Sequence, residues 1–352
     1  MYAFIRSILF ILPPETAHNL SLRLFRFSLA IPFAKTLIRW IFRPKSLPIT
    51  CFGLQFDNPV GLAAGFDKNA HYVDLIQTLS FGYIEIGSVT NQPWSGNAKP
   101  RLFRIKEDQG IINRMGLNNE GADAVSSKLS SLNRRVPLFI NIAKTPDKSM
   151  TESETIRDYC ESVRKLKDQA DVVVLNISCP NADGGRTFED PELLSSLLTG
   201  VRAVLNDGEK PLLVKVSPDL TPEQIAQTIQ VCEDFNIDGY TATNTTINRA
   251  NLVTSNNRLE VIGAGGMSGK PLHKKSVDMV RQIRTLTEKP IVGVGGVFDR
   301  NTAQDFMDAG ASLVQVYSGF IYQGPSIVQR ICDGLTLEIE AVRDQRSSVP
   351  SQ

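Results

Sequence analysis

Residues 171–181 of this chain are Asp171-Val172-Val173-Val174-Leu175-Asn176-Ile177-Ser178-Cys179-Pro180-Asn181. The first part is apolar and mostly β-branched, which is typical of a strand buried in a parallel sheet. Pro180 lacks the N–H that a strand donates to its neighbour, so pairing should end before it. Two amides, Asn176 and Asn181, and the thiol of Cys179 therefore lie at the carboxyl end of a buried strand. An α/β barrel places its functional side chains at this end.

Seven other segments have the same strand-like character, which predicts eight strands in all. The expected strands cover residues 60–64, 83–87, 138–142, 172–177, 212–216, 239–243, 291–294 and 313–317. Helix-compatible stretches lie between them at 151–169, 190–206, 221–235, 275–288 and 300–309, and Thr221 before Pro222 is a typical helix start. This alternation predicts an α/β fold, a (β/α)8 TIM barrel. A doubly wound sheet is the alternative, but the strands have similar lengths and no early Gly-x-Gly-x-x-Gly is present.

The composition is that of a soluble globular protein, with 42% hydrophobic residues, 21% charged residues and a net charge of +1. A charge this small gives no reason to expect a nucleic-acid partner. The five cysteines are scattered without a Cys-x-x-Cys pair, which argues against disulfides, zinc and iron–sulfur clusters and favours a reducing compartment. The three histidines form no His-Glu-x-x-His motif, so no metal site is expected.

The first 45 residues are expected to form a separate helical unit, followed by a barrel domain at 46–345 and a polar tail at 346–352. Prolines divide the unit into short helices, and seven basic residues stand against one acidic residue, Glu15. Its apolar runs are far shorter than the roughly 20 residues that cross a bilayer. It also lacks a signal peptide's apolar core and cleavage site. Two interpretations remain open: amphipathic helices on an anionic membrane surface, or a helical cap on the barrel.

If the barrel is correct, the residues after all eight strands meet at one face. Gly295-Gly296 and Ser318-Gly319 follow the last two strands, where barrels commonly bind phosphate through backbone N–H groups. The same glycines could instead serve only tight turns. Five amides belong to this face: Asn113, Asn141, Asn176, Asn181 and Asn244. Such a set favours a planar ligand whose edge alternates donors and acceptors, such as a pyrimidine or a flavin.

Two lysines and one thiol supply the remaining chemistry of this face. Lys68 and Lys215 stand at strand ends, where an ammonium group would stabilise the negative charge that a flavin gains on reduction. No carboxylate pair or serine–histidine dyad points to hydrolysis. Cys179 is the plausible proton acceptor, because its flanking amides place it in a polar loop rather than in a core.

These residues resemble those of the dihydroorotate dehydrogenase family, from the first helix to the last strand. The segments that carry the resemblance are Gly61-Leu62-Ala63-Ala64-Gly65-Phe66-Asp67-Lys68, Ile112-Asn113-Arg114-Met115-Gly116, Ala242-Thr243-Asn244-Thr245-Thr246, Val292-Gly293-Val294-Gly295-Gly296 and Val316-Tyr317-Ser318-Gly319-Phe320. The family consists of FMN-dependent (β/α)8 barrels of pyrimidine biosynthesis. The N-terminal helices resemble those of its class 2 members, which bind membranes and pass electrons to a quinone.

The resemblance implies a role for each matching residue. FMN would be held by Ala64, Gly65, Lys68, Ser88, Asn141, Asn176, Lys215, Thr243, Gly269, Gly296, Tyr317 and Ser318. The substrate, (S)-dihydroorotate, would be held by Lys68, Asn113, Arg114, Met115, Gly116, Leu117, Asn176, Asn181, Asn244 and Thr245. His18, Arg104 and Tyr317 would line the approach of the quinone. Cys179 would take a proton from C5 while a hydride leaves C6 for FMN, which gives orotate.

Three features depart from the class 2 pattern. Cys179 stands where class 2 enzymes usually carry a serine and class 1 enzymes a cysteine, Leu117 replaces a usual phenylalanine, and the loop 182–188 differs from the usual lid. The same first half-reaction with fumarate or NAD as acceptor is therefore one alternative, and a phosphate-binding isomerase or lyase without flavin is another. The N-terminal helices favour a quinone as the electron acceptor, since a whole helical unit is harder to acquire by chance than one change from serine to cysteine.

The helices also bear on location. They begin almost at Met1, which leaves no room for a transit peptide. We therefore expect a peripheral protein on the cytoplasmic side of a bacterial inner membrane rather than in the mitochondrial inner membrane.

Overall fold

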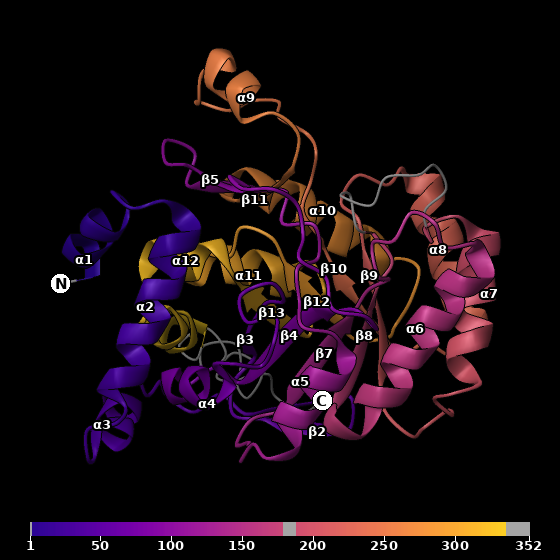
Figure 1. The fold of residues 1–352 in the computed structure, drawn as a ribbon, viewed down its shortest axis with the longest axis horizontal. Helices are drawn as coiled ribbons and strands as arrows, with labels where there is room; N and C mark the ends of the chain where they lie inside the picture. Colours follow the sequence, from indigo (N-terminus) through magenta and orange to yellow (C-terminus); the bar gives the residue numbers. More distant parts are fainter. Residues whose placement is uncertain (1, 179–187, 336–352) are drawn as a thin grey trace, which may run out of the picture.

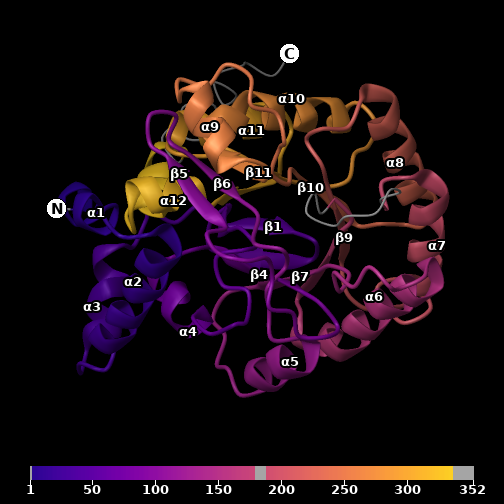
Figure 2. The same ribbon diagram turned by 45° about the horizontal axis from the view of Figure 1, so that its top comes forward.

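The computed structural model describes residues 2–178 and 188–335, and its centre is a closed barrel of eight parallel strands (Figures 1 and 2). The strands are β3 (Val60–Leu62), β4 (Tyr83–Val89), β7 (Leu138–Ile142), β8 (Val172–Asn176), β9 (Leu212–Val216), β10 (Gly239–Ala242), β12 (Ile291–Val294) and β13 (Leu313–Val316). β13 pairs with β3, with Gln315 opposite Gly61, and this pairing closes the barrel. The predicted (β/α)8 barrel is confirmed, and each strand lies within two residues of its expected bounds.

Helices connect the strands and form the outer layer. They are α4 (Val73–Ile76), α5 (Ala122–Ser130), α6 (Glu152–Leu166), α7 (Pro191–Arg202), α8 (Pro222–Asp234), α10 (His273–Arg284), α11 (Arg300–Asp308) and α12 (Ser318–Gln323), with 3-10 turns η1 (Gln77–Leu79), η2 (Lys167–Gln169) and η3 (Lys270–Leu272). Thr221 and Gln224 form a capping box at the start of α8, because the first N–H groups of a helix have no partner within it. The helix start predicted at Thr221 is thus confirmed.

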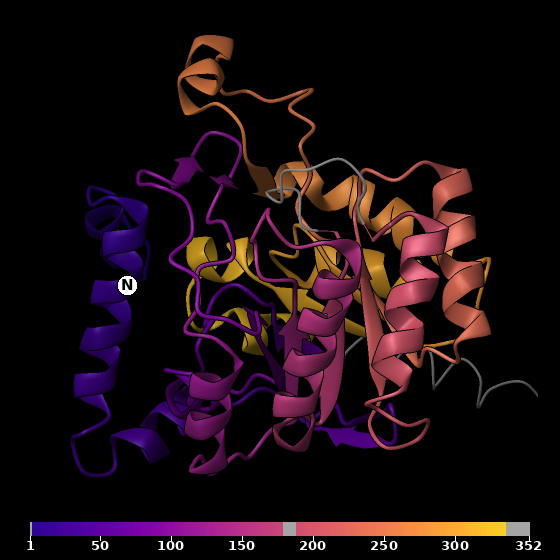
Figure 3. The same ribbon diagram turned by 45° about the vertical axis from the view of Figure 1, so that its right-hand side comes forward.

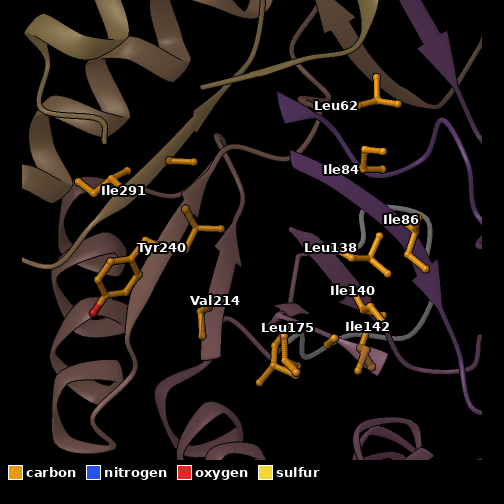
Figure 4. Packing of buried hydrophobic residues seen from close by; sticks show 14 of the residues in the cluster. Leu62, Ile84, Ile86, Leu138, Ile140, Ile142, Leu175, Val214, Tyr240 and Ile291 are labelled. Carbon is orange, nitrogen blue, oxygen red and sulfur yellow. The ribbon is translucent and has the colours of Figure 1, made fainter. Parts of the chain in front are cut away.

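Side-chain alternation along each strand gives the barrel two apolar layers. Ile84 and Ile86 of β4 belong to the layer between strands and helices, which Figure 4 shows from close by. Tyr83 faces the other way, into the barrel, where its ring lies 4.6 Å from that of Phe139. Phe56, from the hairpin of β1 (Ile49–Cys51) and β2 (Leu54–Phe56), packs edge-on against both rings. This apolar plug fills the amino-terminal end of the barrel, so polar side chains can gather only at the carboxyl end.

A small antiparallel sheet lies beside the carboxyl ends of the strands. Its strands β5 (Leu102–Ile105) and β6 (Gly110–Asn113) follow β4, and β11 (Gly266–Gly269) follows β10. The short helix α9 (Asn256–Ile262) projects away from the barrel next to this sheet (Figure 3). No strands were predicted in these segments. β5 and β6 form a short local hairpin, whereas β11 pairs with β6 from a distant part of the chain, which leaves no local pattern.

Three helices at the start of the chain lie along one side of the barrel (Figures 1 and 3): α1 (Tyr2–Leu9), α2 (Pro14–Ser28) and α3 (Ala34–Ile41). Leu22 of α2 packs into the main core, and the Tyr2 hydroxyl donates to Ile321 O over 2.6 Å. On the outside, however, Phe27, Phe33 and Trp40 are 75%, 87% and 73% exposed. The helices therefore have both a face packed on the barrel and an apolar face in solvent. Within the described residues, none of the helices has the length and hydropathy to cross a bilayer.

Candidate active site

The carboxyl ends of the barrel strands surround an open pocket. Residues from both predicted ligand sets line it: Ala64, Gly65, Lys68, Ser88, Asn113, Met115, Gly116, Leu117, Asn176, Lys215, Thr243, Asn244, Thr245, Gly269, Gly296, Tyr317 and Ser318. The barrel thus brings together side chains that are up to 254 positions apart in sequence, from Ala64 to Ser318. A pocket lined by residues of both sets suits a cofactor together with a small substrate.

The floor of the pocket is a hydrogen-bonded network centred on the buried side chain of Glu85 in β4. The Asn141 amide donates to Glu85 Oε1 over 2.7 Å, and Lys215 Nζ lies 3.6 Å from the same oxygen. Gln315 Nε2 donates to the other carboxylate oxygen. An ionised carboxylate only accepts hydrogen bonds, so the two amide donors and the nearby ammonium group supply the partners that it needs when buried.

The network continues from Asn141 up to the pocket wall. Ser88 Oγ donates to Asn141 Oδ1, and Asn176 Nδ2 donates to Ser88 Oγ over 3.1 Å. Asn141 does not line the pocket, although the resemblance places it among the FMN ligands. In this structure it would act on a ligand through Ser88 and Asn176 rather than by direct contact.

Two further amides stand on other walls of the pocket. Asn244 Nδ2 donates to Ser178 O over 2.6 Å, and Asn113 Nδ2 donates to Gly266 O over 3.3 Å. Each amide is therefore held by a backbone carbonyl from a different segment. Together with Asn176 they give the pocket polar groups on three sides, which suits a planar ligand with polar edges.

Arg114, also predicted to hold the substrate, lies outside the pocket lining. Its guanidinium group lies 4.6 Å above the Phe103 ring and donates to Ala264 O over 2.9 Å. These contacts tie β6 to the segment between α9 and β11. Arg114 therefore supports the wall that carries Asn113 and Met115.

Glycines form a wall that suits a phosphate group. At Gly296, where φ is +70°, a Cβ would lie 2.6 Å from His273 Cβ and 2.8 Å from Gly269 O, so a side chain has no space there. His273 Nδ1 is buried and has no hydrogen-bond partner among the described residues. Ser318 Oγ lies 2.8 Å from Ser268 Oγ in the same pocket. Backbone N–H groups at such close turns bind phosphate, so the residues present fit FMN, with the polar floor for its ring and this wall for its phosphate.

Lys68 supplies a second cationic group to the pocket. The loop that carries it is fixed by the buried carboxylate of Asp67, which accepts the backbone N–H groups of His71 and Tyr72 over 2.9 and 2.6 Å. Lys68 Nζ donates to Gly65 O over 3.1 Å. Burial lowers the pKa of Lys68 to about 8, and the charge of Arg101 adds to this shift. At neutral pH Lys68 is thus still a cation and can bind an anionic group.

His18 connects α2 to the pocket through a series of rings. Its ring lies edge-on to that of Phe66 at 4.8 Å, and Phe66 lies 6.1 Å from Tyr317, which lines the pocket. Burial, and secondly the charge of Lys68, lower the pKa of His18 to about 4, so the imidazole is neutral at pH 7. Of the three residues predicted for the quinone approach, His18 and Tyr317 therefore lie on one path.

Arg104 lies apart from that path, on β5. Its guanidinium group lies 4.3 Å above the Phe10 ring and donates to Leu12 O over 2.9 Å. It thus holds the link between α1 and α2 against the small sheet.

The predicted proton acceptor Cys179, the predicted ligand Asn181 and residues 182–187 of the loop lie outside the described residues, as does the tail at 346–352. Their roles stay predictions. The segment that leads to them agrees with the prediction of a strand at 172–177, because β8 ends at Asn176. The buried Ser178 hydroxyl donates to Lys215 O.

Three residues of the site were not predicted from the sequence: Gln315 and Ser268, which line the pocket, and Glu85, which is buried beneath it. Glu85 stands in the run Tyr83-Ile84-Glu85-Ile86, and an acidic residue inside an otherwise apolar strand is a signal that could have revealed it. Gln315 gives the same signal in β13. Ser268 gives none, because it reaches the pocket only through the pairing of β11 with β6.

The fold and the pocket define a (β/α)8-barrel enzyme with a polar site whose residues fit a flavin nucleotide and a small planar substrate. The family model described as dihydroorotate dehydrogenase matches residues 46–339. A quinone-dependent dihydroorotate dehydrogenase of Natronomonas pharaonis is 42% identical, covering 99% of this chain and 97% of the relative, and one of Christiangramia forsetii is 42% identical, covering 94% and 96%. A crystal structure of DHODH from Eimeria tenella in complex with ferulenol has a TM-score of 0.76 at 32% identity, covering 89% of this chain and 93% of that one. The chain belongs to the dihydroorotate dehydrogenase family.

Proposed function

We propose that this protein oxidises (S)-dihydroorotate to orotate in pyrimidine biosynthesis, with FMN as its cofactor and a quinone as the electron acceptor. One observation carries the proposal: a single pocket combines three amides, two lysines and a glycine wall. The named quinone-dependent relatives support the choice of acceptor, because the match to the Natronomonas pharaonis protein covers 99% of this chain and so includes most of the N-terminal helices.

FMN would supply the electron-accepting ring of the reaction. Ser88, Asn176 and Lys215 would bind and orient that ring from the floor of the pocket, and Gly296 with Ser318 would hold the phosphate. The ammonium group of Lys215 is suited to stabilising the negative charge that the ring gains on reduction.

The substrate carries a carboxylate and a ring edge of alternating C=O and N–H groups. Asn113, Asn176 and Asn244 offer donors and acceptors for that edge, and Lys68 offers a cation for the carboxylate. Cys179 would take the proton from C5, since a thiol with a reference pKa of about 8.5 needs less activation as a base than a serine hydroxyl. The Cys179 enzyme should therefore keep its rate at lower pH than a Cys179→Ser variant, and superimposable pH–rate profiles would contradict this assignment.

The N-terminal helices would attach the protein peripherally to the cytoplasmic face of a bacterial inner membrane. Their exposed apolar side chains and surplus of basic residues support this proposal, because such surfaces bind bilayers that contain anionic lipids. The quinone would then enter between α2 and the barrel and approach Tyr317 past His18.

A parallel assay tests the proposal. The purified protein, mixed with dihydroorotate, should show the flavin band near 450 nm bleaching and should turn over with a quinone but not with fumarate or NAD. Faster turnover with fumarate or NAD would overturn the choice of acceptor and leave the first half-reaction intact. A colourless protein that binds no FMN would overturn the oxidoreductase assignment itself.

A further inference from the structure

The carboxylate of Glu85 is the most deeply buried charge beneath the pocket, and no role has been assigned to it so far. Glu85 is 0% exposed. It stands two residues beyond Tyr83 and on the same inward face of β4, so an apolar side chain there would simply have extended the plug that fills the barrel. A buried ion pair is often no more stabilising than apolar side chains of similar volume. The stability of the fold therefore gives no reason for a carboxylate at this position.

The partners of Glu85 give a functional reason. Lys215 and Gln315 both line the pocket, and both face the carboxylate. The third partner, Asn141, is turned so that its nitrogen faces Glu85, which leaves its oxygen to accept from Ser88. One carboxylate thus sets the orientation of three side chains at the pocket floor, each from a different strand.

The orientation of Asn141 in turn fixes the direction of the hydrogen bonds that lead to the pocket wall. Because Ser88 Oγ donates its proton to Asn141, it can only accept from Asn176 Nδ2. This turns Asn176 Oδ1 away from Ser88 and toward the backbone N–H of Ser178, 3.3 Å away. The direction of every hydrogen bond from Glu85 to Asn176 therefore follows from the charge of the carboxylate.

We infer that Glu85 is the positioning residue of the flavin site. Its carboxylate orders the donors and acceptors of the pocket floor and offsets the charge of Lys215. This inference rests on the proposed function, because the group that it tunes is FMN. With Lys215 Nζ only 3.6 Å from Glu85 Oε1, the floor carries a nearly neutral pair rather than a free cation. Removal of the carboxylate leaves a full positive charge under the ring, which favours the reduced flavin.

Glu85→Gln is the decisive variant, because it removes the charge but keeps the shape. Gln315 can accommodate the new amide by turning its own, since its Oε1 has no hydrogen-bond partner within the described part of the chain. The matched control is Asp158→Asn. Asp158 is also a buried carboxylate, but it accepts from Thr145 N and Oγ1 over 2.7 and 2.8 Å and does not line the pocket.

The midpoint potential of the bound FMN is the measurement, by spectroelectrochemical titration of the FMN-loaded proteins. For Glu85→Gln we expect the equilibrium to move toward reduced flavin by about tenfold, which is about 30 mV upward for a two-electron couple. Asp158→Asn should lower thermal stability and leave the potential unchanged. An unchanged or lower potential in Glu85→Gln, or an equal rise in Asp158→Asn, overturns the inference.

Two further outcomes separate the inference from the proposed function. If the wild-type protein binds no FMN, the proposed function fails first. If Glu85→Gln does not fold, Glu85→Asp decides the matter, because it keeps the charge but withdraws the carboxylate from its partners. It should keep the wild-type potential and bind FMN about tenfold more weakly, as measured by fluorescence titration of the apoprotein. Unchanged FMN affinity in Glu85→Asp overturns the inference.

Discussion

The floor of the barrel pocket and the outer face of the N-terminal helices depart from the usual distribution of side chains in opposite ways. The floor buries charged groups, Glu85 and Lys215, where a core is normally apolar. The helices expose apolar groups, among them Phe27, Phe33 and Trp40, where a surface is normally polar. Each departure costs folding free energy, so each points to a ligand that compensates for it when bound. For the floor we propose a flavin, and for the helices a membrane.

The largest effect that would test this comparison concerns the exposed apolar face. Replacement of Phe27, Phe33 and Trp40 by serine should weaken binding to vesicles with anionic lipid by at least about 10³-fold, because each buried aromatic side chain contributes about 1.5–3 kcal/mol. Turnover with a short-chain soluble quinone should persist. Vesicle co-sedimentation and a steady-state assay measure the two quantities.

The control for that variant replaces three exposed apolar residues that lie outside the N-terminal helices. Ile247, Val253 and Val261 are 63%, 77% and 87% exposed but lie in the segment between β10 and β11. Their replacement by serine should leave vesicle binding unchanged. Equal loss in both triple variants would mean that exposure alone, rather than the N-terminal face, governs binding.

The next largest effect lies in the barrel. Cys179→Ala should slow reduction of the flavin by dihydroorotate by at least roughly 10²-fold, the usual contribution of a positioned base. Reoxidation of the reduced protein by a quinone should be unchanged, because that step uses the other region. Stopped-flow absorbance near 450 nm follows both steps, and flavin reduction at a near-normal rate would remove Cys179 from the role of base.

The pH dependence of ligand binding should distinguish the pocket from the N-terminal helices further. The pKa of Lys68 is lowered to about 8, so the ammonium group is present below pH 8 and is lost as the pH rises through that value. Orotate, an anion, should therefore bind tightest below pH 8, and its Kd should rise by up to tenfold per unit above it. Spectral titration in the Cys179→Ala background avoids interference from the thiol.

Lys68→Met is the matched variant for that profile. It should bind orotate more weakly and show no such break near pH 8. Vesicle binding, which depends on arginine and lysine side chains of the N-terminal unit, should show no break at this pH in either protein. A wild-type orotate profile that stays flat up to pH 10 would show that Lys68 does not contact the carboxylate.

The smallest expected effect belongs to the scaffold that both regions share. Thr221→Ala removes the side chain that caps α8, which should lower the free energy of unfolding by about 1 kcal/mol. Thermal unfolding should shift by only a few degrees, and neither flavin reduction nor vesicle binding should change. A loss of activity in this variant would mean that α8 takes part in the site.

Much of the barrel could be predicted because its elements leave local signals. β8 is buried on both faces and is apolar from Val172 to Leu175, and Thr221-Pro222 marks a helix start within two residues. The pocket residues at strand ends could also be predicted, since the barrel topology alone brings the strand ends together. The sheet of β5, β6 and β11 was missed, because β5 and β6 are short strands and β11 joins their hairpin from a distant part of the chain. The resemblance implied that Arg114 binds the substrate, whereas its guanidinium group donates to Ala264 O and lies outside the pocket lining.

The sequence by itself determined the barrel, the polar character of its mouth and the apolar, basic character of the first 45 residues, because periodicity and composition are local properties of the chain. Only the tertiary structure decided which polar groups act together. Glu85, Asn141, Lys215 and Gln315 lie on four different strands, and nothing in their spacing shows that one carboxylate faces the other three. Burial gives those contacts their strength, since charges and hydrogen bonds are far more consequential away from water, and burial is a property of the closed barrel rather than of any single strand.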